Sequence, residues 1–332
     1  MWIFKVGDVL SGIIVKMLPS RVSDRIMFNS SEYSVYVLRT RSMKKKHRMT
    51  FMEAVFATIL FDLALFGTSN PIINGIIRFF TSLQNSWDRP FSSKEDAVTQ
   101  VTEFCKRLSI QQNPWIWEKS IEDYVSLNDF FSRTYAQSEF PSLGTASIVA
   151  PACCTLTRYN DDASMKSFLI KGCNYRIEDI GLPSEDIHLY RQHPVFVGYL
   201  SPTDYHRIHS PTTGKCTLCK MEGIHEKSAS VKFFGGKFNI LNSNKRVVIV
   251  IDSGNIKVGL IVIGGIGVDS IVYDSNITGQ QITKGQELSA FRAGGSAIAM
   301  FSTAPIQFTP EFEGASKKHA HVEVQVGESL AD

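Results

Sequence analysis

The chain has 332 residues, and its 35 lysines and arginines nearly balance 32 aspartates and glutamates, which argues against a nucleic-acid-binding protein with a strongly basic face. Hydrophobic residues make up 43% and charged residues 20% of the chain, which excludes wholesale disorder, and the length allows one large domain with an appendage or two modest domains. Six cysteines are too few and too scattered for a disulfide scaffold, which favours an intracellular, reducing location.

The N-terminal region, residues 1–86, is expected to be an apolar and basic helical region that associates with a membrane. Its most apolar stretch, residues 51–66, contains Glu53 and Asp62 and is shorter than the roughly 20 apolar residues of a spanning helix. The basic run KKKHR at 44–48 precedes it, and such a cluster before an amphipathic helix suits an anionic membrane surface. The alternative is a helix packed on the main domain beside a solvated charged turn. A mitochondrial and an endomembrane location both stay open.

Residues 1–135 are predicted to be mostly helical, and the chain after about residue 145 is predicted to be rich in strands. A capped amphipathic helix is expected within residues 92–110, with Ser92 or Ser93 as the N-cap. Short runs rich in valine and isoleucine then follow, and they are broken by glycine, proline and asparagine. This order predicts an α+β fold: a helical N-terminal region followed by a β-rich antiparallel-sheet domain.

Two histidines stand on one proline-bounded segment, YLSPTDYHRIHSP at residues 199–211. The prolines argue against a regular helix and for a rigid loop that fixes the direction of each imidazole. From the residues alone, His206 and His209 could bind a metal, act as acid and base near neutral pH, or cap backbone groups.

A Gly-Gly-Ser sequence at 294–296 lies between apolar, strand-like runs. Such a triplet is usually only a turn in which glycine supplies a positive φ. A sharper interpretation is that the Ser296 hydroxyl attacks the carbonyl of Gly295, with a histidine such as His209 as the base.

The pair Cys216 and Cys219 has the spacing of half a zinc or redox site, but no second CxxC occurs in the chain. The surrounding segment is predicted to be a strand, in which positions i and i+3 point to opposite faces. No metal site is therefore expected.

Over residues 87–332 the chain resembles the phosphatidylserine decarboxylases, a family of self-cleaving proenzymes with a pyruvoyl cofactor. The YHRIHSP element followed by GGS is specific in combination, although GGS alone would carry no information. The matching segments, in the family's order, are WDRP, YVSLNDFFSRTY, SIVAPACCTL, FLIKGCNY, VGYLSPTDYHRIHSP, NSNKRVVIVIDS, VIGGIGVDSI, KGQELSAF and VEVQVGESLA.

The resemblance implies that Ser296 attacks Gly295, which leaves a β fragment ending at residue 295 and an α fragment, 296–332, that begins with a pyruvoyl group. It implies that His209 is the base of this cleavage. The pyruvoyl group would then form a Schiff base with phosphatidylserine and act as the electron sink for its decarboxylation to phosphatidylethanolamine. His206 matches the histidine that assists decarboxylation or protonates the product. Implied partners are phosphatidylserine, a membrane surface, the two fragments of the same chain and a possible homodimer, with no nucleic acid.

The chain departs from the family at Cys153, which stands where a Pro-Ala-Asp motif supplies the aspartate of the cleavage triad. A thiol is a poor acceptor for an imidazole N–H. In serine proteases, changing the orienting carboxylate costs about 10⁴-fold in rate, roughly 5.5 kcal/mol of barrier. Asp161 and Asp162 are nearby candidates to substitute for it.

Two alternatives therefore stay open beside the decarboxylase. One is an inactive, unprocessed member of the family that serves as a lipid or protein interaction module, which Cys153 favours. The other is a decarboxylase of a soluble amino acid, against which the apolar and basic N-terminal region favours a lipid substrate.

Overall fold

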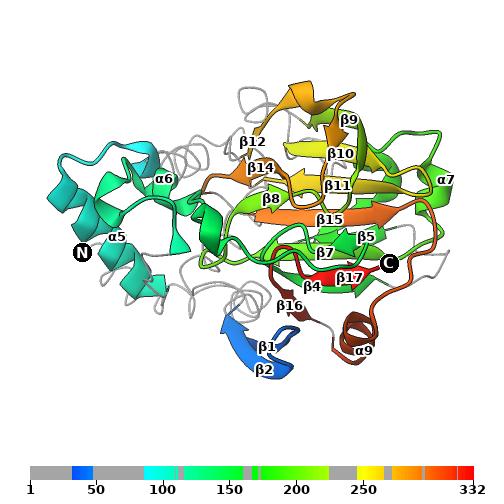
Figure 1. The fold of residues 1–332 in the computed structure, drawn as a ribbon, viewed down its shortest axis with the longest axis horizontal. Coiled ribbons are helices and arrows are strands. Elements are labelled where there is room, and N and C mark those ends of the chain that lie inside the picture. Colours follow the sequence, from blue (N-terminus) through cyan, green and yellow to red (C-terminus); the bar gives the residue numbers. More distant parts are fainter. Residues whose placement is uncertain are drawn as a thin grey trace, which may run out of the picture.

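A ten-stranded β-sheet forms the centre of the structure, a computed structural model that describes residues 32–47, 86–108, 110, 116–159, 167–170, 173–223, 245–264, 271–293, 296–319 and 321–332 (Figure 1). The order of strands across this sheet is β13-β9-β10-β11-β15-β7-β4-β16-β1-β2. Its strands are β1 (Glu32–Val37), β2 (Ser42–His47), β4 (Cys154–Tyr159), β7 (Val195–Leu200), β9 (Gly214–Glu222), β10 (Arg246–Asp252), β11 (Lys257–Ile263), β13 (Gln281–Ile282), β15 (Ser296–Ser302) and β16 (Val322–Val324).

Smaller elements surround the sheet. A three-stranded sheet has the order β12-β14-β8, and β17 pairs with β3, and β5 with β6. These strands are β3 (Ile148–Val149), β5 (Ser167–Ile170), β6 (Cys173–Arg176), β8 (Arg207–His209), β12 (Ile271–Tyr273), β14 (Glu287–Phe291) and β17 (Ser329–Ala331). The helices are α5 (Lys94–Leu108), α6 (Leu127–Phe131), α7 (Ile187–Tyr190) and α9 (Pro310–Lys318), with 3₁₀ turns η1 (Ser86–Asp88), η3 (Ile121–Asp123), η4 (Gln137–Glu139), η5 (Ile177–Asp179) and η7 (Ser275–Ile277).

Strands β10, β11 and β15 are apolar almost without a break because both faces of the sheet are covered. In β10, Val247, Ile249 and Ile251 belong to one buried cluster, and Val248 and Val250 belong to the other. All seven residues of β15 are buried, and this strand is hydrogen-bonded between β11 and β7. Ser296, the first residue of β15, therefore lies inside the core.

The prediction of an α+β fold with an antiparallel sheet is confirmed for the described residues, where every strand pairing is antiparallel except that of β1 with β16. The predicted amphipathic helix is α5. The Ser93 hydroxyl accepts a hydrogen bond from the backbone N–H of Asp96 at 3.2 Å, which makes Ser93 the N-cap. In Figure 1, α5 and α6 lie together at one end of the sheet.

Residues 32–47 form a β-hairpin, so the prediction of helix is wrong for this part of the N-terminal region. β1 pairs with β2 along its whole length and runs parallel to β16 on its other side. The sequence EYSVYV has the β-branched and aromatic residues typical of a strand, and Val35 is completely buried. Most of the basic run lies in edge strand β2. The apolar segment 51–66 lies outside the described residues, and the domain boundary after residue 86 stays a prediction.

Simple alternation predicted that Cys216 and Cys219 lie on opposite faces of their strand, and this prediction is wrong. The pairing of β9 with β10 is irregular at Thr217, which is passed over as the extra residue of a β-bulge. The bulge changes the alternation, and both cysteines are buried in the same apolar cluster. Their surroundings are those of structural thiols.

Candidate active site

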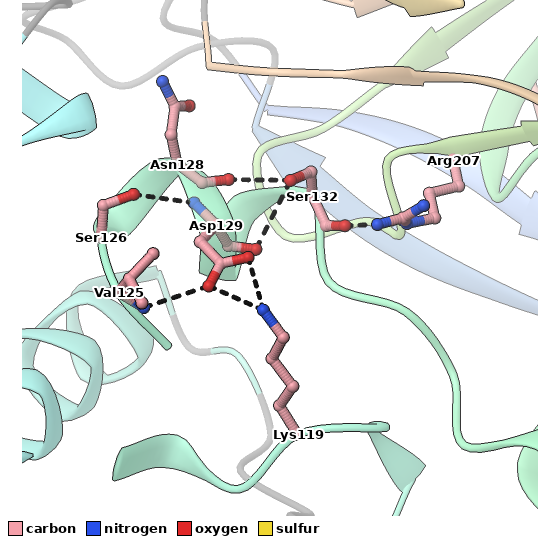
Figure 2. A network of polar contacts seen from close by, with 7 residues as sticks. All are labelled: Lys119, Val125, Ser126, Asn128, Asp129, Ser132 and Arg207. Carbon is pink, nitrogen blue, oxygen red and sulfur yellow. Dashed lines mark hydrogen bonds and ion pairs between the residues drawn. The ribbon is translucent and has the colours of Figure 1, made fainter. Parts of the chain in front are cut away.

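The short helix α6 lies next to the histidine segment, and the residues that follow the helix hold that segment through hydrogen bonds. The Ser126 hydroxyl accepts a hydrogen bond from the N–H of Asp129 at 3.1 Å and caps the helix (Figure 2). The Asp129 carboxylate accepts from the N–H of Val125 at 3.0 Å and binds the Lys119 ammonium through both of its oxygens at 2.9 Å. These contacts fix the first turn of the helix.

Asn128, on the same turn, connects two distant segments. Its Oδ1 accepts a hydrogen bond from the backbone N–H of Ala293 at 2.7 Å, and its Nδ2 donates to Asp88 at 2.9 Å. The residue is only 6% exposed. Asn128 thus holds the chain two residues before Gly295, which itself lies outside the described residues.

Ser132 and Arg133, which follow α6, hold the loop that carries the two histidines. The carbonyl of Ser132 accepts from Arg207 Nε at 2.8 Å (Figure 2), and Arg207 also pairs with Glu287 at 2.5 Å. Arg133 is 2% exposed, and its guanidinium donates to the carbonyls of Thr203 at 3.1 Å and Asp204 at 3.2 Å. A buried cation therefore fixes the loop immediately before the histidines.

His206 is buried, at 1% exposure, with its ring centroid 3.8 Å from that of Phe131. Burial, followed by the positive charge of Arg133, lowers the pKa of His206 to about 3. Its carbonyl accepts from the N–H of Phe291 at 2.8 Å. Within the described part of the chain its Nδ1 has no hydrogen-bond partner. His206 is thus a neutral imidazole with one ring nitrogen free.

His209 is held at both ring nitrogens. Nδ1 lies 2.8 Å from the carbonyl oxygen of Gly285, and Nε2 lies 3.0 Å from the hydroxyl of Tyr205. Because a carbonyl can only accept, the proton is on Nδ1, and the Tyr205 hydroxyl donates to Nε2. Burial lowers the pKa of His209, so the neutral form is favoured.

Ser296 is the first residue of β15 and is 1% exposed. Among the described residues, its Oγ has no hydrogen-bond partner, which costs about 1–3 kcal/mol for a buried hydroxyl and calls for a functional explanation. Ser296 pairs with Leu200 on β7, and Phe291 bonds to the backbone of His206. These two pairings attach Ser296 and Phe291 to Leu200 and His206, which lie six residues apart on one stretch of chain.

Cys153 does not contact His209 through any hydrogen bond found among the described residues. Its sulfur accepts from the N–H of Val326 at 3.4 Å and lies 3.9 Å from the Tyr135 hydroxyl. Burial raises the pKa of the thiol to about 11, so it is uncharged at neutral pH. The sequence-based assignment of Cys153 as the partner of His209 is therefore not supported by its contacts.

Asn128, Tyr205 and Gly285 are among the residues of this site that were not singled out from the sequence. All three lie inside the quoted motifs, so position in a motif was the available signal, but which atoms they contact depends on the fold. Asp161 and Asp162 lie outside the described residues. Within the described ranges, no three histidine, cysteine or acidic side chains are grouped as metal ligands are.

Comparison with known proteins identifies the same region. A family model described as phosphatidylserine decarboxylase matches residues 127–332. A phosphatidylserine decarboxylase proenzyme of Halalkalibacterium halodurans is 28% identical over 283 residues, covering 84% of this chain and 98% of the relative. The proenzyme of Bacillus thuringiensis is 28% identical over 249 residues, with coverages of 73% and 89%. That of Chlamydia trachomatis is 25% identical over 277 residues, with coverages of 78% and 91%.

Proposed function

The chain belongs to the phosphatidylserine decarboxylase family, and on that premise we propose that it is a carboxy-lyase proenzyme that converts phosphatidylserine to phosphatidylethanolamine after cleaving itself between Gly295 and Ser296. The observation that carries this proposal is the buried hydroxyl of Ser296 at the start of a central strand, which has no hydrogen-bond partner among the described residues. The three relatives above are all named as proenzymes, which favours this function over an unprocessed interaction module.

The residues present fit the pyruvoyl group that the family makes from its serine. Ser296, the residue from which the group would be made, and His206 are both buried, and neither Ser296 Oγ nor His206 Nδ1 is engaged by a neighbour among the described residues, so His206 Nδ1 would be available to the group. When formed, that group supplies an electron sink for loss of the substrate carboxylate. Phe131 covers the ring of His206 and keeps water from it.

The two histidines have different proposed roles. His209 is neutral, and its Nε2 is the atom that takes the proton of the Ser296 hydroxyl once the Tyr205 hydroxyl turns away. His206 is neutral and buried, with Nδ1 free to hold or deliver a proton during decarboxylation. This division matches a difference in their contacts: both ring nitrogens of His209 are engaged, whereas Nδ1 of His206 has no partner among the described residues.

The α fragment, 296–332, is expected to stay bound after cleavage. It contributes β15, which is hydrogen-bonded to β11 on one side and β7 on the other and is buried throughout. It also contributes α9, β16 and β17. Separating the fragments would expose this apolar strand, at about 25 cal/mol for each Å² of apolar surface.

The test of the proposed function is an intact mass spectrum of freshly purified protein under denaturing conditions, with Ser296→Ala as the matched control. We expect fragments 1–295 and 296–332, the latter without its serine amine, and a single 37.1 kDa species for the control. Native size exclusion should keep the two fragments together. Only the cleaved protein should release carbon dioxide from phosphatidylserine vesicles. An active chain that stays whole would contradict the proposal.

We further propose that the enzyme works at a membrane surface, as its lipid substrate requires. In the described ranges, no helix has the length and apolar character to cross a bilayer. Lys44 and Lys45 of edge strand β2 expose their side chains. Comparison of phosphatidylserine vesicles with free serine as substrate separates a lipid enzyme from one that acts on a soluble amino acid. The homodimer stays a prediction.

Loss of the Asn128 side chain is expected to slow self-cleavage by roughly 10- to 100-fold. Asn128→Ala removes the acceptor of the buried Ala293 N–H, and displacement of a reacting segment by about 1 Å can cost 10²-fold in rate. The measurement is the rate at which fragment 296–332 appears after synthesis in a cell-free system. Lys94→Ala, which removes an exposed ion pair with Asp123 at the start of α5, is the control and should change the rate by less than about threefold.

A further inference from the structure

We propose that the backbone carbonyl of Gly285, and not the side chain at position 153, orients His209 for self-cleavage. The proposal rests on the proposed function, because it concerns the histidine assigned there as the base. It assigns Gly285 as a positioning residue and explains how the chain can carry cysteine where its family has a carboxylate.

The first observation is the contact itself. The carbonyl oxygen of Gly285 lies 2.8 Å from Nδ1 of His209, the nitrogen opposite the one that must accept a proton. A carbonyl oxygen accepts the Nδ1 proton as a carboxylate would, and it thereby selects the tautomer whose Nε2 has a free lone pair. It carries no formal charge, so it stabilises a protonated ring less than a carboxylate does.

The second observation is that the Gly285 turn is firmly held. The N–H of Gly285 donates to the Ser210 carbonyl at 2.9 Å, and the N–H of Ser210 donates to the Gln286 carbonyl at 2.7 Å. The Lys284 ammonium donates to the carbonyls of Gly144 at 2.9 Å and Ala146 at 2.6 Å. The turn is therefore tied both to the histidine segment and to the chain before β3.

Only glycine suits this position. Gly285 has a φ of +81°, in the left-handed region, and a Cβ atom there would lie 2.6 Å from Cδ1 of Leu143. A side chain would have to displace either Leu143 or the turn, and moving the turn moves the carbonyl that contacts His209. The requirement for glycine thus connects directly to the orientation of the imidazole.

The third observation is that position 153 points to other partners. The Cys153 sulfur contacts Val326 and Tyr135, whereas His209 contacts Gly285 and Tyr205. Burial, and to a smaller extent the negative charges of Asp204 and Glu328, raise the pKa of the Cys153 thiol. A carboxylate placed here would meet the same repulsion, so a neutral side chain suits the position.

The experiment compares full-length chains with single substitutions for the rate of appearance of fragment 296–332. We expect Cys153→Ala to cleave within about threefold of the parent, Cys153→Asp to be no faster than the parent, and Gly285→Ala to be at least 10-fold slower. A loss of more than 100-fold in Cys153→Ala, a gain of more than 10-fold in Cys153→Asp, or an unchanged rate in Gly285→Ala would each overturn the proposal.

A second measurement does not depend on activity. In the Ser296→Ala chain, ¹⁵N chemical shifts of His209 report which ring nitrogen carries the proton, and we expect Nδ1 in both that chain and its Cys153→Ala derivative. A proton on Nε2 in either chain would refute the assignment of Gly285. If the parent chain never cleaves, the proposed function fails, but the tautomer still decides how His209 is oriented. The same readout serves if Gly285→Ala does not fold.

Discussion

Replacement of His209 by alanine is expected to leave the chain at 37.1 kDa under conditions in which the parent cleaves completely. General base catalysis contributes about 10²- to 10⁴-fold, so a chain that lacks its base is expected to stay whole on this time scale. The measurement is the fraction of fragment 296–332 on a denaturing gel over several days. His188→Ala, at an exposed position on α7, is the control and should cleave normally.

The decrease in the parent's cleavage rate at low pH should follow the protonation of His209. His209 acts as a base only when it is unprotonated, so the rate falls as the pH drops through its pKa. Because burial lowers that pKa below the ordinary value of about 6.5, the fall should be centred below pH 6.5. A half-maximal rate above pH 6.5, or rapid cleavage by His209→Ala, would exclude His209 as the base.

The elements that could be predicted from the sequence are those whose signal is local. α5 has a serine cap and an amphipathic repeat, and β10, β11 and β15 are continuous apolar runs that can hardly be anything but buried strands. The hairpin at 32–47 was missed because SMKKKH has no strand pattern of its own, and β1 is completed by β16, almost three hundred residues away. The strand residues of β1 were a local signal, but the pairing that completes the hairpin in the sheet is long-range.

The candidate site likewise contains residues that a local motif indicates and residues whose contacts depend on the fold. Ser296, His206 and His209 stand in short motifs that can be recognised without a fold. Gly285 acts through its backbone carbonyl, a group that every residue has. A glycine in the sequence therefore indicates a turn and gives no hint of a contact with His209. Cys153 shows the limit of a motif: its place there suggested a role beside His209, whereas the hydrogen-bond contacts of its sulfur in the structure are with Val326 and Tyr135.

Replacement of His206 by glutamine is expected to separate the two reactions of the chain. We expect cleavage within about 10-fold of the parent, because the base assigned to cleavage is His209, and a loss of 10²- to 10⁴-fold in decarboxylation of phosphatidylserine vesicles. Glutamine keeps a polar group in the buried site, but its amide cannot take up and release a proton as an imidazole does. Cleavage is read by mass spectrometry and decarboxylation by carbon dioxide release from the same sample.

The pH dependence tests whether His206 stays uncharged over the working range. With its pKa lowered to about 3 by burial and by Arg133, His206 is uncharged in the parent from pH 5 to 8. The ratio of parent to His206→Gln activity should therefore be the same at pH 6 and pH 8. Phe131→Leu, which loosens the packing on the ring without removing it, is the matched control and should lose far less activity. If His206→Gln blocked cleavage as fully as His209→Ala, the two histidines could not have the separate roles assigned to them. A ratio that changed 10-fold between pH 6 and pH 8 would show that His206 is not uncharged throughout this range.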